Sequence, residues 1–143
     1  ATYGKAPNPL TTFTPRIPYI LHHNLNRAAR FHSEDMMACN RMSHTSCDGT
    51  TFGARLRAFA NTSGAECIAT SYRTSLLAVD AWLHSDAGHR DALMHTGYRD
   101  IGCGHALGTT HWWTVDLASL SPAQAHPAYG GSHQTITTGT TDF

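Results

Sequence analysis

The sequence predicts one α+β domain, and three observations support this. A chain of 143 residues suits a single domain, because two domains of half this size would each lack an adequate core. Apolar residues recur at helical spacing in several segments between residues 21 and 95. Two extended segments, 98–107 and 111–117, then follow in succession and have the composition of β-strands.

The first 38 residues divide into an arm and a helix. Residues 1–20 contain four prolines and predict an extended N-terminal arm. A helix over 21–38 follows, with an apolar face that includes a core histidine: Leu21, Leu25, Ala28, His32 and Met36. A polar loop, 40–51, separates this helix from a short second helix over 53–59.

The second half of the chain supplies the remaining elements. We expect a short buried strand at 66–69, then a helix that Thr74 caps and that turns Leu76, Val79 and Leu83 toward the core. The turn 86–89 begins a further helix to about His95. The strands 98–107 and 111–117 are joined by the turn 108–110. Alternation within the last strand sends Trp112 and Trp113 to opposite faces and leaves room for one of them to be exposed.

The ends of the chain differ in composition from its middle. We therefore divide it into the arm 1–20, a domain over 21–118, and a Ser/Thr/Gly/Pro-rich tail over 119–143. The tail either adds an edge strand around 134–138 or attaches loosely beside the domain. We expect a monomer.

Charge and hydropathy exclude two classes of partner. Ten Lys and Arg balance ten Asp and Glu, so no basic field is present to attract nucleic acid. No run of about 18 apolar residues is present, so the chain is not transmembrane. Histidine is unusually frequent, with 11 residues, which indicates either metal binding or a response to pH.

The four cysteines indicate the compartment. They are too widely spaced for a C-x-x-C motif. Cys39 and Cys47 close a short loop and predict one disulfide, and Cys67 with Cys103 follows by elimination. An even cysteine count and a single lysine favour an oxidising, extracellular location, and a chain starting at Ala1 is compatible with a secreted form whose leader was removed. The alternative is four buried thiols in a cytosolic protein.

Five ordered motifs resemble those of the CAP superfamily, the cysteine-rich secretory, antigen 5 and pathogenesis-related-1 group, also called SCP domains. The motifs are of the bacterial type and together cover residues 21–118. They are the segments Ser43-His44-Thr45-Ser46, Ala65-Glu66-Cys67-Ile68-Ala69, Trp82 to Leu93 with Gly88-His89-Arg90, Ile101-Gly102-Cys103-Gly104 and Trp112-Trp113-Thr114.

The resemblance implies a fold and a site. It implies an α-β-α sandwich with a small, mostly antiparallel central sheet between helical layers, in a protein that is secreted. It also implies a cavity with two histidines and acidic residues that binds a divalent metal in several family members. The histidines carry over to His44 and His89, and one acid to Glu66. Where the animal and plant pattern has a second glutamate, this chain has Ser85.

The chemistry of these three residues suits zinc. Two neutral imidazoles and a carboxylate would leave one coordination position for water. A helix N-terminus disfavours imidazolium and would keep His89 neutral. Milder roles remain open: His44 hydrogen-bonds loop backbone, His89 caps its helix, or Glu66 pairs with an arginine such as Arg90.

Two functions are compatible with these observations. The first is a secreted binding module for defence or signalling, with a small apolar ligand such as a lipid or sterol that the resemblance implies. The second is a zinc-dependent hydrolase in which His44 and His89 hold the metal and Glu66 acts as general base or third ligand.

Overall fold

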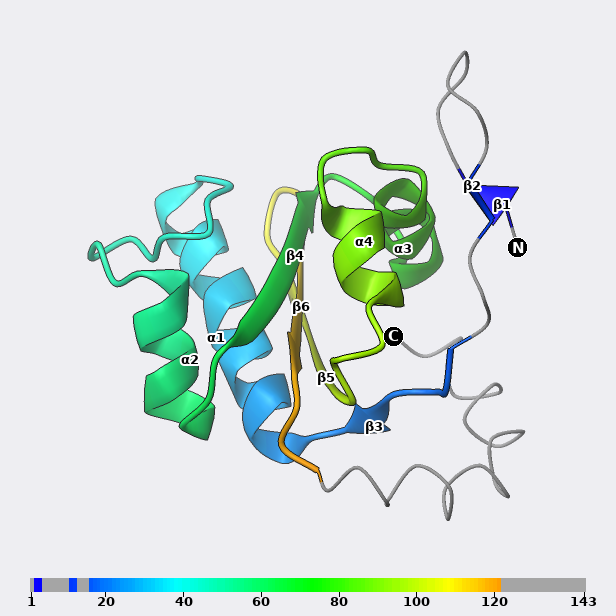
Figure 1. Cartoon of the computed structure of the whole chain (residues 1–143). Coiled ribbons are helices and arrows are strands. Elements are labelled where there is room, and N and C mark those ends of the chain that lie inside the picture. Colours follow the sequence, from blue (N-terminus) through cyan, green and yellow to red (C-terminus); the bar gives the residue numbers. More distant parts are fainter. Residues whose placement is uncertain (1, 4–10, 13–15, 122–143) are drawn as a thin grey trace.

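A four-stranded sheet forms the middle layer of the computed structural model, which describes residues 2–3, 11–12 and 16–121 (Figure 1). The strand order is β3–β5–β6–β4, and only the β3–β5 pair is parallel. The strands are β3 (Ile20–Leu21), β4 (Gly64–Thr70), β5 (Asp100–Leu107) and β6 (His111–Ala118). Two further short strands, β1 (Thr2–Tyr3) and β2 (Thr11–Thr12), pair with each other. Strand β4 is therefore one edge of the main sheet.

Helices cover both faces of this sheet (Figure 1). On one face, α1 (His23–Cys39) packs on β5 and β6, and α2 (Phe52–Ala60) packs on α1. The other face is covered by α3 (Ser75–Leu83) and α4 (His89–Met94). The predicted α-β-α sandwich with a small, mostly antiparallel sheet is thus confirmed.

Side-chain caps explain where α2 and α3 begin, and left-handed residues explain where α1 and α2 end. Thr51 and Thr74 each accept a hydrogen bond from the backbone N–H three residues later, which caps α2 and α3. Asn40 and Asn61 end α1 and α2 in the left-handed region, with φ of 49° and 51°. Helix α1 begins at His23 instead of Leu21, because Leu21 belongs to β3, where its side chain is exposed.

The backbone of α1 approaches β5 closely at two glycines. A Cβ atom at Gly102 would collide with the backbone of Leu25, and one at Gly104 with the backbone of Ala29. The Gly-x-Gly spacing therefore lets the helix lie directly on the strand, since alternate residues of a strand face the same side.

Packing corrects two of the sequence predictions. Leu76 is 75% exposed on α3 and does not face the core, whereas Ala78 and Trp82 of the same helix are buried. Trp112 and Trp113 do point to opposite faces, but both are buried because helices cover both faces of the sheet. The expectation that one tryptophan could be exposed was therefore wrong.

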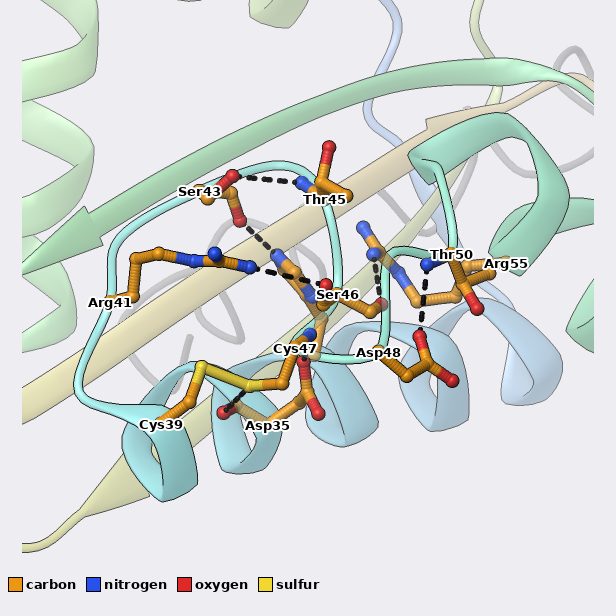
Figure 2. Close-up of a disulfide and its surroundings, with 11 residues drawn as sticks. Asp35, Cys39, Arg41, Ser43, Thr45, Ser46, Cys47, Asp48, Thr50 and Arg55 are labelled. Carbon is orange, nitrogen blue, oxygen red and sulfur yellow. Dashed lines mark hydrogen bonds between the residues drawn. A yellow bond between two sulfur atoms is a disulfide. The ribbon is translucent and has the colours of Figure 1, made fainter.

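One of the two predicted disulfides is present in the structure and the other is not. The Cys39–Cys47 disulfide is confirmed (Figure 2). The Cys67–Cys103 disulfide was wrong, because both cysteines are free thiols. Cys67 of β4 and Cys103 of β5 are each paired with Val115 of the intervening strand β6. Two strand spacings of roughly 4.8 Å separate them, which is beyond the reach of a disulfide. Burial raises the pKa of each thiol to about 12.

The predictions for the two ends of the chain reach outside the described residues. Most of the arm over 1–20 and the tail beyond residue 121, including the edge strand expected around 134–138, lie there. The last described residues are held by Asp100, whose carboxylate accepts hydrogen bonds from the backbone N–H groups of Leu120 and Ser121 at 2.6 and 2.8 Å.

The close approach of α1 to β5 gives a stability prediction. Gly104→Ala should lower the free energy of unfolding by about 1–3 kcal/mol, because the added methyl group meets helix backbone that cannot rotate away. Gly53→Ala is the matched control, since a Cβ there meets only the flexible end of Arg57 at 3.4 Å. Urea unfolding of both variants provides the measurement, and equal stability of the two would contradict this account of the motif.

Candidate functional site

The centre of the candidate site is Glu66, which lies on the edge strand β4 with its side chain only 1% exposed. One carboxylate oxygen accepts a hydrogen bond of 2.9 Å from Nδ1 of His44. The other accepts one of 2.6 Å from the guanidinium of Arg55. A buried carboxylate requires such partners, because leaving it unpaired costs several kcal/mol. The predicted contact between His44 and Glu66 thus has a physical reason.

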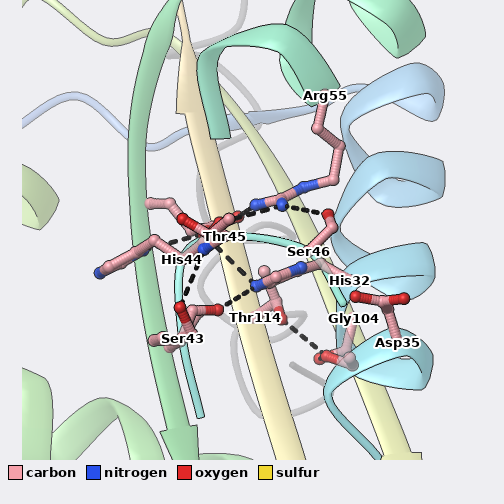
Figure 3. Close-up of polar contacts among 12 residues, drawn as sticks. His32, Asp35, Ser43, His44, Thr45, Ser46, Arg55, Gly104 and Thr114 are labelled. Carbon is pink, nitrogen blue, oxygen red and sulfur yellow. Dashed lines mark hydrogen bonds and ion pairs between the residues drawn. The ribbon is translucent and has the colours of Figure 1, made fainter. Parts of the chain in front are cut away.

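Arg55 of α2 is the residue that the sequence reasoning missed. Its guanidinium is buried and donates to the carbonyl oxygen of His44 at 3.1 Å and to Oγ of Ser46 at 3.0 Å (Figure 3). It also donates to Glu66. The suggested partner Arg90 was wrong, because Arg90 forms an ion pair with Asp86. A signal for Arg55 was present: with Phe52, Leu56 and Phe59 it shares the spacing of the buried helix face.

One stripe of α1 holds the loop that carries His44. Buried His32 approaches the carbonyl oxygen of Ser43 with its Nε2 at 2.7 Å. One turn later, the Asp35 carboxylate accepts a hydrogen bond of 2.7 Å from the backbone N–H of Cys47, and Cys39 forms the disulfide (Figure 2). These contacts and Arg55 together fix the backbone position of His44.

The predicted role of His32 as a core histidine is consistent with its environment. Because a carbonyl oxygen can only accept, Nε2 of His32 carries the proton of this hydrogen bond. Burial lowers the pKa of His32 and outweighs the opposing charge of Glu66, whose carboxylate lies 3.8 Å away. The ring is therefore a neutral donor that supports the loop from inside the protein.

A second carboxyl group, Asp116, lies behind Glu66. The two residues are paired in the β4–β6 register, and Asp116 is completely buried. Burial and then the charge of Glu66 raise the pKa of Asp116 well above its ordinary value. Burial also acts to raise the pKa of Glu66, but the hydrogen bond from His44, together with Asp116 and Arg55, holds it below the usual range. The single negative charge therefore resides on Glu66, where Arg55 balances it.

His89 is the first residue of α4 and approaches β4 from the opposite face. Its Nδ1 lies 2.9 Å from Oγ of Ser85, which stands where the resemblance implied a second glutamate. Its backbone carbonyl contacts the Cys67 thiol at 3.8 Å, which places it beside the strand that carries Glu66. Burial, and then the charge of His44, lower the pKa of His89. The lowered pKa favours the neutral ring.

The three predicted site residues do not form one compact ligand set. His44 and Glu66 are in direct contact, whereas Nδ1 of His89 contacts Ser85 instead of the carboxylate. In the part of the chain that the structure describes, no group of three or more His, Cys, Asp and Glu side chains is placed to hold a metal ion. Glu66 is committed to His44 and Arg55, so it positions a histidine instead of facing solvent.

A cleft of about 520 Å³ adjoins His89 and Ser85. Its other walls are mainly apolar and come from the His44 loop, β4, the segment after β4, and α3: Met42, Ile68, Tyr72 and Trp82. Met42 and Tyr72 are 52% and 40% exposed, so solvent reaches the cleft. The arrangement combines an apolar groove with an imidazole at one wall.

The fold and the site together define a class of protein: an α-β-α sandwich in which a buried glutamate at a sheet edge supports an exposed histidine. The family model of the cysteine-rich secretory protein family, CAP, matches residues 20–117. The chain belongs to this family, and the resemblance seen in its motifs is confirmed.

Two solved structures are similar to this chain. One is an extracellular protein containing an SCP domain from Bacillus anthracis, with 26% identity and a TM-score of 0.60 over 71% of this chain. The match covers 33% of the Bacillus protein, so this chain spans about a third of its length. The other is an outer surface protein of Borrelia burgdorferi, with 21% identity, a TM-score of 0.60, and coverage of 71% of this chain and 77% of that one. No curated protein sequence matches.

The buried ion pair predicts a large effect of a single substitution. Arg55→Leu should destabilise the protein by about 3–5 kcal/mol, because it leaves the Glu66 carboxylate buried without its cation. Arg57→Leu, at an exposed position of the same helix, is the control and should change stability by less than about 0.5 kcal/mol.

The double variant Arg55→Leu/Glu66→Leu separates charge from packing. It should recover part of the stability lost in Arg55→Leu, because it removes the uncompensated charge. Chemical unfolding of the wild type, Arg55→Leu, Arg57→Leu and the double variant provides the comparison. If the double variant were less stable than Arg55→Leu, the loss of stability in Arg55→Leu would not come from the unpaired Glu66 charge.

Proposed function

We propose that this chain is an extracellular CAP-domain binding module in which His44 and His89 bind a divalent metal ion, most suitably Zn²⁺, beside an apolar ligand cleft. The observation that carries the proposal is the way each imidazole is supported. Both rings use Nδ1 for a contact inside the protein, with Glu66 behind His44 and Ser85 behind His89. That leaves Nε2 of each ring for an external ligand.

The carboxylate behind His44 favours metal binding at its other nitrogen. Because Glu66 is ionised and can only accept, Nδ1 of His44 is the protonated nitrogen and Nε2 keeps its lone pair. A carboxylate that orients a histidine in this way also raises its basicity as a ligand. The ring is half exposed, with 51% of its side chain accessible, so an ion can reach it.

Ser85 supports His89 less strongly than a carboxylate would. A hydroxyl group can donate to or accept from Nδ1, so it orients the ring without adding charge. The lowered pKa of His89 keeps its nitrogens available near neutral pH. The proposed set is therefore two histidines with Glu66 as a positioning residue, and it differs from the three-ligand set that the residue types suggested.

The hydrolase alternative receives less support. A general base needs an accessible carboxylate near the attacking water. Glu66 is 1% exposed and is held by Arg55 at 2.6 Å, so neither of its oxygens is free for that role. A bound metal would supply Lewis-acid chemistry at His44 and His89, but the residues around them favour binding over catalysis.

The extracellular assignment rests on two observations. Cys39 and Cys47 form a disulfide, which persists in oxidising compartments. The two similar structures are described as an extracellular protein and an outer surface protein. Among the described helices, none is both long and apolar enough to cross a membrane.

The metal proposal predicts which substitutions weaken Zn²⁺ binding. His44→Ala and His89→Ala should each abolish the binding event seen by calorimetry at pH 7, and Glu66→Gln should weaken it about 10–100-fold. Affinity should fall as the pH is lowered from 7 to 5, because protons compete with the metal for imidazole nitrogens. His95→Ala, at an exposed histidine outside the site, is the control. Unchanged Zn²⁺ binding in the His44→Ala/His89→Ala double variant would refute the proposal.

The cleft predicts binding of a small lipid-like ligand. A fatty acid carrying a fluorescent group should bind wild-type protein, and Tyr72→Asp should weaken binding at least tenfold by placing a charge on the apolar wall. Leu107→Asp is the matched control, because Leu107 is an exposed apolar residue that does not line the cleft. Equal effects of the two substitutions would show that the cleft is not the binding place.

A further inference from the structure

Two histidines outside the candidate site lie in direct contact. His105 near the end of β5 and His111 at the start of β6 are on opposite strands of the β5–β6 hairpin. Nε2 of His105 lies 2.8 Å from Nδ1 of His111. The ring planes differ by only 15°, and the ring centres are 5.1 Å apart. The pair is therefore a hydrogen-bonded imidazole dyad.

The two rings meet edge to edge instead of face to face. The distance between their centres exceeds the distance between the bonded nitrogens by 2.3 Å, roughly one ring radius on each side. The two nitrogens therefore point at each other, and one of them must carry the proton that the other accepts. A metal ion that binds both nitrogens displaces this shared proton, which a neutral imidazole can carry on its other ring nitrogen instead.

The indole of Trp113 and the pairing of β5 with β6 hold the two histidines in place. The His105 ring stacks on the Trp113 indole, with centres 4.0 Å apart and planes 21° apart. Trp113 is itself buried and donates from its indole N–H to the carbonyl oxygen of Tyr72 at 2.7 Å. The register pairs His105 with Trp113 and His111 with Leu107, and a tight turn closes the hairpin beyond them.

We propose that His105 and His111 form a binding site for a divalent transition-metal ion of the nickel or copper type. Two imidazole nitrogens at about 2.0 Å from a metal and at a right angle to each other would lie roughly 2.8 Å apart, which is the separation observed. To face one ion at that angle, each lone pair turns by about 45° away from the line that joins the two nitrogens. His105 is exposed, so water can complete the coordination.

Two further properties favour the site. Burial, and then the charge of His111, lower the pKa of His105, which keeps its nitrogen available to a metal near pH 7. Of the two arginines that share a neighbouring cavity with His105, Arg30 is paired with Glu34 at 3.1 Å, which reduces the positive charge that an ion would meet. The site is separate from the cleft beside His89, which neither His105 nor His111 lines. It does not depend on the proposed function of His44 and His89.

Titration with Ni²⁺ tests the proposal, since this ion does not oxidise the free thiols Cys67 and Cys103. Wild-type protein at pH 7.5 should show a Ni²⁺ binding event in which the indole N–H signal of Trp113 broadens before those of Trp82 and Trp112 in NMR spectra. His105→Ala and His111→Ala should each weaken that event at least tenfold, and the broadening of Trp113 should disappear.

A reciprocal set of variants separates this site from the candidate site. His44→Ala/His89→Ala and His95→Ala should leave the Ni²⁺ event and the Trp113 broadening unchanged. NMR spectra of each metal-free variant show whether the hairpin is still folded, and a conservative His111→Gln tests loss of the ligand with less disturbance of packing. Ni²⁺ binding that is unaffected in His105→Ala and His111→Gln, or that is lost only in His44→Ala/His89→Ala, would overturn the proposal.

Discussion

The buried ion pair between Arg55 and Glu66 is the interaction on which the rest of the site depends. Glu66 lies on the edge strand of the sheet and Arg55 on α2, so the pair links two layers of the sandwich. The same guanidinium holds the backbone of His44 and the hydroxyl of Ser46. The Glu66 carboxylate would be costly to bury alone, and the arginine that compensates its charge also fixes the position of the exposed His44.

The charges of the cluster formed by Arg55, Glu66 and Asp116 are balanced. Asp116 and Glu66 face each other in the register of β4 and β6, yet Arg55 can neutralise only one negative charge. Burial beside Glu66 raises the pKa of Asp116, so this cluster holds one anion, Glu66, and one cation, Arg55. His32 is neutral for the same reason, since burial lowers its pKa. The interior therefore presents one well-defined hydrogen-bond acceptor to His44.

Much of the fold could be predicted from the sequence, whereas the partners of the buried charges could not. The helical spacing in α1 and the Thr74 cap of α3 depend only on residues close together in the sequence, so both could be predicted, and both are present in the structure. The partner of Glu66 depends on how α2 packs across the sheet, so the nearby sequence suggested Arg90 when Arg55 is the partner. The Cys67–Cys103 disulfide failed for a related reason: strand order is not visible in sequence, and β6 lies between the two cysteines.

Two sets of histidines, His44 with His89 and His105 with His111, show how the hydrogen-bond partner of an imidazole determines its chemistry. A buried carboxylate fixes the proton of His44 on Nδ1, and a hydroxyl orients His89 without fixing its tautomer. In the β5–β6 hairpin, each imidazole is instead the partner of the other, and Trp113 supplies the support. A ring backed by an anion is a stronger base toward a metal than one backed by another neutral ring. In the proposed function, the carboxylate behind His44 makes its Nε2 the more basic metal ligand, whereas the proposed hairpin site relies on the 2.8 Å separation of its two nitrogens.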